Sequence, residues 1–108
     1  MGFDAYENAV EIAREMRELV DTIRQSDQDL AKQARRATQS IGLNIAEARK
    51  RSAGDRRRQF EIALGSAGEA RAALEQADAW GYVPTERAKP VLERLDREIA
   101  MLWRLSGR

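Results

Sequence analysis

Apolar residues recur at alternating steps of three and four along nearly the whole chain, a spacing that places them on one side of an α-helix. The first run predicts a helix over residues 5–25, and we expect Asp4, with Glu7 three residues later, to cap its start. This run consists of Ala9, Ile12, Met16, Leu19 and Ile23, widened by Val10, Ala13 and Val20. A helix with so broad an apolar face must pack against other elements.

Three more runs of the same spacing follow, separated by short polar breaks. The segment Ser26-Asp27-Gln28-Asp29 is a second cap candidate and precedes a helix of about 22 residues. A third helix begins at Ser52 or Asp55 and ends near Gly81, a suitable C-terminal stop. Pro90 favours a start of the fourth helix near Lys89, although Thr85 to Lys89 could form a preceding turn of that helix.

Connections of a few residues between long helices force neighbouring helices to run antiparallel. We therefore predict an all-α fold, an antiparallel up-down-up-down four-helix bundle, as a single domain over residues 1–108.

The predicted third helix has a seam made mostly of alanine, and Gly65 and Gly68 lie beside it. Glycine weakens a helix interior, so we expect these two positions to allow a neighbouring backbone to approach closely.

Several classes of protein are disfavoured by composition. The chain has no Cys and no His, which removes disulfides, thiolate and imidazole metal ligands and the usual general base. We therefore expect no metal site, no cofactor and no catalytic activity.

No apolar stretch approaches the length of a membrane span, and residues 1–6 show no export or lipid-anchor signal. We therefore expect a cytoplasmic protein with no membrane partner.

One polar residue, Asn44, lies in the apolar seam of the second helix. Further polar residues lie beside it or on the third helix: Ser40, Glu47, Ser66 and Glu69. One interpretation is a hydrogen-bond network that fixes how these helices, or two subunits, pack together. The alternatives are a ligand pocket around Glu47 and Glu69, or a two-carboxylate metal or acid-base site. Two carboxylates without histidine are a thin basis for a metal site, and the network is therefore the favoured interpretation.

The net charge is +1, from 19 basic and 18 acidic residues, so any attraction to polyanions must come from a local cluster. The break after the second helix holds such a cluster, which consists of Arg49, Lys50, Arg51, Arg56, Arg57 and Arg58. Cations suit the C-terminal end of a helix but oppose the dipole at the start of the next one. Helix stabilisation thus explains only part of the cluster, and nucleic-acid binding is a second interpretation.

Three aromatic residues, Trp80, Tyr82 and Trp103, lie near the ends of the third and fourth helices. Because aromatic side chains bury large areas, we expect them to fill the end of the core. An anchor at a subunit contact is the alternative.

Two of the polar motifs, Asn-Ile-Ala-Glu at residues 44–47 and Gly-Ser-x-x-Glu at residues 65–69, together with Trp80-Gly81-Tyr82, resemble a known family. It is the four-helix-bundle family of 23S ribosomal RNA intervening-sequence proteins, which includes the accessory variability determinants of diversity-generating retroelements. The resemblance extends from Tyr6 to Leu105, with Ala48 in place of a usual glycine. It implies a ring-like homopentamer without enzymatic activity. For the retroelement members it also implies binding to a reverse transcriptase and to nucleic acid.

The function predicted from the sequence is that of a non-enzymatic, homo-oligomeric scaffold or binding protein that presents a surface to a protein or nucleic-acid partner. The alternative is a nucleic-acid-binding accessory protein that uses the basic cluster between the second and third helices.

Overall fold

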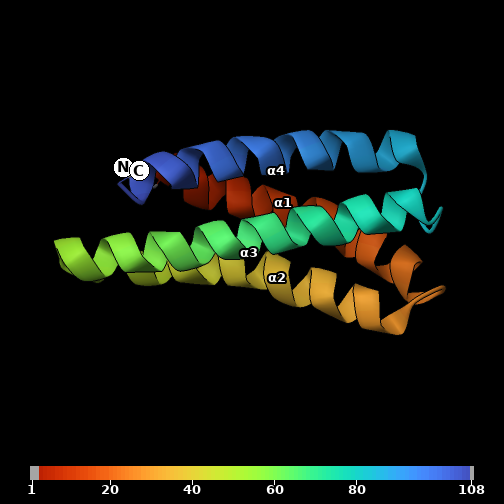
Figure 1. Cartoon of the computed structure of the whole chain (residues 1–108), viewed down its shortest axis with the longest axis horizontal. Coiled ribbons are helices and arrows are strands. Elements are labelled where there is room, and N and C mark those ends of the chain that lie inside the picture. Colours follow the sequence, from red (N-terminus) through yellow and green to blue (C-terminus); the bar gives the residue numbers. More distant parts are fainter. Residues whose placement is uncertain (1–2, 108) are drawn as a thin grey trace.

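The computed structural model describes residues 3–107, which form four α-helices joined by short loops. These are α1 (Phe3–Arg24), α2 (Gln28–Ala48), α3 (Ala53–Ala79) and α4 (Thr85–Leu105). Figure 1 shows them lying side by side with alternating direction, so the predicted all-α four-helix bundle is confirmed. Met1 and Gly2, part of the segment searched for a targeting signal, lie outside the described residues.

The four helices enclose one core. Each helix packs against the next in sequence, and α1 closes the bundle by packing against α4. The resulting rod measures 42 × 22 × 20 Å. The α2–α3 end of the rod extends past the start of α1 and the end of α4 (Figure 1).

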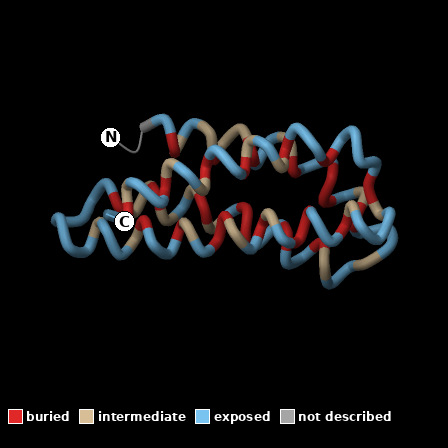
Figure 2. Tube along the Cα trace, turned by 45° about the horizontal axis from the view of Figure 1, so that its top comes forward, coloured by how far each residue is buried: buried red, intermediate tan, exposed pale blue. Residues whose placement is uncertain are grey.

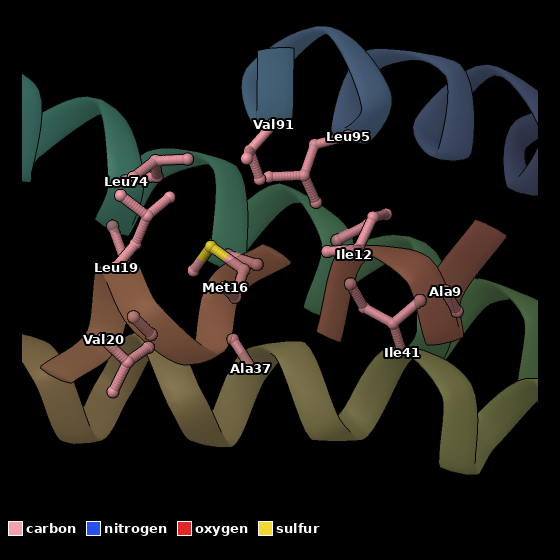
Figure 3. Close-up of a cluster of buried hydrophobic side chains, with 14 of the residues drawn as sticks. Ala9, Ile12, Met16, Leu19, Val20, Ala37, Ile41, Leu74, Val91 and Leu95 are labelled. Carbon is pink, nitrogen blue, oxygen red and sulfur yellow. The ribbon is translucent and has the colours of Figure 1, made fainter. Parts of the chain in front are cut away.

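The core combines long aliphatic side chains from α1 and α4 with mostly short ones from α2 and α3, which also contribute Ile41, Ile45, Phe60 and Leu74. Ile12 and Met16 of α1 and Leu95 of α4 are almost fully buried and point toward the axis of the bundle (Figure 3). The buried residues of α2 and α3 are largely alanines, among them Ala34, Ala63, Ala67, Ala70 and Ala77. Alanine side chains take up little space, so α2 and α3 can approach each other closely.

The structure distinguishes between the cap candidates. Asp27 is the N-cap of α2, and its carboxylate accepts a hydrogen bond from the Leu30 amide at 2.9 Å. The predicted cap at Asp4 is wrong, because α1 already begins at Phe3 and Asp4 lies inside the first turn. Ser52 precedes α3 without a side-chain cap bond, and Asp55 lies in the first turn of that helix, where its charge favours the helix dipole.

Gly81 ends α3 as expected. It adopts a φ of 76°, a left-handed conformation that favours glycine. The amide of Tyr82 donates to the Ala77 carbonyl and the amide of Gly81 to the Asp78 carbonyl, which is the Schellman pattern of helix termination.

The fourth helix begins at Thr85, so the interpretation that placed its start near Lys89 is wrong. Pro90 lies inside α4 on its exposed side, where solvent can reach the backbone carbonyl that a proline leaves without a hydrogen-bond donor. The turn before it is held by the amides of Arg87 and Ala88, which both donate to the Pro84 carbonyl at 3.1 Å. Thr85 adds a hydroxyl hydrogen bond of 2.6 Å to the Asp78 carboxylate of α3.

The expectation that Gly65 and Gly68 allow close backbone approach is wrong. A Cβ atom at either position would meet nothing within 4 Å, because Gly65 faces solvent and Gly68 is only half-buried.

Among residues 3–107, no helix combines the length and apolar content that a membrane crossing requires.

Replacement of an unneeded helical glycine should stabilise the protein. We expect Gly65→Ala to raise the free energy of unfolding by roughly 0.5–1 kcal/mol, because alanine loses less backbone entropy in a helix. Urea denaturation followed by circular dichroism measures this change. Gly81→Ala is the contrasting variant and should destabilise, because its positive φ strains any residue with a Cβ. A loss of stability in Gly65→Ala would show that Gly65 contacts something outside the chain.

Candidate functional site

The polar motif residues of α2 and α3 form a hydrogen-bonded contact between the two helices. The hydroxyl oxygens of Ser40 and Ser66 lie 2.7 Å apart. Asn44 donates to the Ser40 hydroxyl at 2.9 Å and to the Ser40 carbonyl at 2.8 Å, and Gln59 donates to the Asn44 side-chain oxygen at 3.5 Å. Serine side chains are short, so this contact requires α2 and α3 to be close together. The network therefore fixes the register of α2 relative to α3.

The two motif carboxylates do not meet. Glu47 of α2 pairs with Arg51 of the α2–α3 loop at 2.9 Å, and Glu69 is exposed on α3. Measured from the Ser40–Ser66 contact, Glu47 lies two turns toward the α2–α3 loop and Glu69 one turn the opposite way, so their levels differ by about 15 Å. The geometry gives no support to a site that uses both carboxylates. The described residues also hold no group of three or more acidic side chains placed to bind a metal ion.

A shallow groove runs along the outside of the α2–α3 contact. Its volume is about 500 Å³, and it is open to solvent. Ser40 and Ser66 form part of its floor, and Arg36, Glu69 and Gln76 stand at its edges. The charged residues here face water rather than one another. The groove thus offers hydrogen-bonding groups to a partner surface, without the enclosure that a small-molecule site needs.

The basic cluster forms the tip of the α2–α3 hairpin, the part of the rod that extends furthest (Figure 1). None of residues 49–59 is buried, so the tip contributes nothing to the core (Figure 2). Several arginines in the tip are held in place. Arg49 lies over the Tyr6 ring at 4.5 Å, Arg56 donates to the Arg51 carbonyl at 3.0 Å, and Arg51 pairs with Glu47.

Of the remaining cations of the tip, Lys50 and Arg58 extend into solvent, while the Arg57 side chain packs against Gly107 beyond the end of α4. Lys50, Arg57 and Arg58 are exposed, and among the described residues none of the three has an acidic partner. The tip therefore combines a fixed arginine framework with free positive charge. Such an arrangement attracts phosphate groups.

A buried polar pair between α1 and α4 was not predicted from the sequence. Glu98 is fully buried, and its Oε1 accepts a hydrogen bond from Asn8 at 3.0 Å, while its Oε2 has no partner among the described residues. Arg94 frames the pair by donating to Asn8 at 3.2 Å and to Glu15 at 3.2 Å. A signal was available, since Glu98 falls in the spacing Val91, Leu95, Glu98, Leu102 of a buried stripe.

Burial raises the pKa of the Glu98 carboxyl from 4.5 to about 7, and the hydrogen bond from Asn8 opposes this rise only in part. The native state therefore holds a proton that the unfolded chain releases near pH 4.5. The contribution of Glu98 to stability is fully present below that pH and is lost as the pH rises through 7.

This linkage predicts that Glu98→Gln is more stable than the parent at pH 8, by on the order of 2–3 kcal/mol, because glutamine mimics the protonated carboxyl. At pH 4 the two proteins should be nearly equally stable. Urea denaturation at both pH values gives the difference, in which the effects of the other carboxylates cancel. A difference that stays the same at both pH values would show that the pKa of the Glu98 carboxyl is the same in the folded and unfolded chains, which contradicts this linkage.

The prediction that the aromatic residues fill the end of the core is wrong for both tryptophans. Trp80 is 70% exposed and Trp103 is 51% exposed, while Tyr82 is half-buried and stacks on Trp80 with a centroid distance of 6.3 Å. Trp80 falls at the C-cap of α3, one residue beyond the last helical turn, and therefore misses the core. Leu43 of α2 (69%) and Ile62 of α3 (42%) are also exposed.

Comparisons with known proteins agree with the resemblance seen in the sequence. The family model described as "23S rRNA-intervening sequence protein" matches residues 2–104. A crystal structure of a protein of unknown function from the S23 ribosomal protein family of Bacteroides thetaiotaomicron superposes with a TM-score of 0.88. The match covers 96% of this chain and 99% of that one at 23% sequence identity, which shows a shared fold. No curated protein matches the sequence.

Proposed function

We propose that this chain, which belongs to the 23S rRNA-intervening sequence protein family, is a cytoplasmic binding or scaffold protein that assembles into a homo-oligomer of five copies and catalyses no reaction itself. One observation carries the proposal. The polar motif residues are engaged in packing α2 against α3, while large apolar side chains remain on the outside of the bundle.

The exposed side chains support self-association more than a reactive site. Leu43, Ile62 and Trp103 lie on the sides of the rod, where a neighbouring protein can cover them. Exposed apolar groups of this size are common at subunit contacts. The motif carboxylates, by contrast, lie apart: Glu47 is half-buried and pairs with Arg51, and Glu69 is exposed on α3.

The assembly predicts the mass of the protein in solution. Size-exclusion chromatography with light scattering at micromolar concentration should give the mass of five 12.2-kDa chains. Native mass spectrometry gives the number of copies independently. A single 12.2-kDa species by both methods would refute the proposed assembly.

The protruding tip supports a second function, binding of a nucleic acid by its phosphates. The supporting observation is that Lys50, Arg57 and Arg58 are exposed at the end of the rod that carries no core residue. An oligomer would present several such tips at once, and the binding of each would add to the others. The contacts available are to phosphate, so little preference among base sequences is expected.

This second function predicts that Lys50→Glu with Arg58→Glu weakens RNA binding and makes it less sensitive to salt. The slope of log affinity against log salt should fall by about one for each phosphate contact removed. Fluorescence anisotropy with a labelled RNA at several salt concentrations measures both effects. The matched control, Lys89→Glu with Arg97→Glu on the exposed side of α4, changes the net charge equally and should retain binding. Equal affinities for all three proteins would exclude the tip.

A further inference from the structure

The side of the bundle formed by α1 and α2 is hollowed and partly apolar. One hollow of about 390 Å³ is lined by Val10 and Ala13 from α1 and by Leu43 and Ala46 from α2. A second hollow continues along the same two helices from Ala13. The apolar face of α1 is therefore broader than the stripe that the bundle buries, which leaves Val10 and Ala13 partly or largely exposed.

The side formed by α3 and α4 lies opposite the α1–α2 side and carries an ion pair and an exposed aromatic side chain. Arg71 of α3 bonds Asp96 of α4 at 2.6 Å, which fixes the two helices at that level. Leu64 precedes Arg71 by seven residues, and Trp103 follows Asp96 by seven. Because α3 and α4 are antiparallel, both steps lead two turns toward the same end of the rod, so Leu64 and Trp103 share a level on this side. Trp103 is 51% exposed there.

The two opposite sides carry their features in the same order along the rod. On the α1–α2 side, Arg17 and Arg35 line the second hollow, and Val10 and Leu43 lie about two turns from them toward the tip. The Ser40–Ser66 contact relates the levels of α2 and α3. Arg35 comes five residues before Ser40 and Arg71 five residues after Ser66, so the charged levels coincide on the two sides.

The charges on these sides are complementary. Arg17 and Arg35 have no acidic partner among the described residues, and Arg24, which also lines the hollow, pairs with Asp21. The α1–α2 side is therefore positive.

On the α3–α4 side the balance is reversed, because one guanidinium, that of Arg71, is shared by two carboxylates. Asp96 bonds it at 2.6 Å and Glu75 at 3.2 Å, which leaves this cluster negative.

We propose that the α1–α2 side of one copy binds the α3–α4 side of a second copy, with Trp103 and Leu64 against the hollow at Val10 and Leu43. In this arrangement Arg17 and Arg35 face Glu75 and Asp96. This inference rests on the proposed self-association and names the surfaces that produce it. The contact joins unlike surfaces, so every copy keeps one free side for the next copy, and repetition closes a ring when the rotation allows it.

The size of the rod fits such a contact. A side of about 42 by 20 Å offers roughly 800 Å² per partner, the area of a standard specific interface. A contact between identical α1–α2 sides would instead bring Arg17 and Arg35 of both copies together. That arrangement is electrostatically unfavourable.

Cross-linking tests the pairing directly, since the chain has no native cysteine. The protein with both Leu43→Cys and Trp103→Cys, treated with a short bis-maleimide, should give a ladder of covalently joined chains on a denaturing gel. Either substitution alone should give monomers, because the contact brings position 43 of one copy to position 103 of the next. The matched control pairs Trp80→Cys with Trp103→Cys. Residue 80 lies at the other end of the rod, so this control should give monomers.

A second variant keeps the test informative if Trp103→Cys alters folding. Leu43 is 69% exposed, so Leu43→Glu should leave the helical content unchanged but reduce the mass in solution to one chain. Trp80→Ser, which removes an equally exposed side chain, should leave the assembly intact.

The possible outcomes separate this inference from the proposed function. A monomeric parent protein would refute both. An oligomeric parent whose Leu43→Glu variant stays oligomeric, with no ladder from the double cysteine protein, would refute the named surfaces alone. Dimers from a single cysteine substitution would show that like sides meet, which contradicts the contact proposed here.

Discussion

Close contact between α2 and α3 is the constraint on which the rest of the bundle depends. Both helices present alanines to the core, such as Ala34 and Ala67, and two serine hydroxyls meet across the contact at 2.7 Å. Long side chains at these positions would separate the helices and break that hydrogen bond. With α2 and α3 held this closely, the large residues of α1 and α4 complete the core from the other side, as Ile12 and Leu95 do.

The helices were predictable from the sequence because an apolar stripe with helical spacing is a strong local signal. Asp27 and Gly81 were predictable for the same reason, since a cap and a left-handed stop each depend on a few neighbouring residues. Pro90 left the start of α4 open between Thr85 and Lys89, because the cost of a proline depends on which side of the helix it occupies. That side is fixed by packing against the other helices rather than by the local sequence.

The candidate site was less predictable, because residue type alone does not determine exposure. Trp80 and Trp103 have the size of core residues, yet each lies just outside the buried stripe of its helix. Glu98 is the reverse case, because its residue type is usually exposed but it lies within the buried stripe of α4. Its partner, Asn8, is ninety positions away in the chain. Only the tertiary arrangement shows that this carboxyl is buried away from solvent. The basic tip was visible as a cluster, but its projection beyond the core was not.

The projection of the tip gives the rod two unlike ends. The arginine-rich α2–α3 tip marks one end, and the stacked pair of Trp80 and Tyr82 marks the other. Copies joined side by side with their axes parallel would place every tip on one face of the assembly and every aromatic pair on the opposite face. Such a particle has a polarity, so that a long polyanion could run across one surface while a different molecule occupies the other.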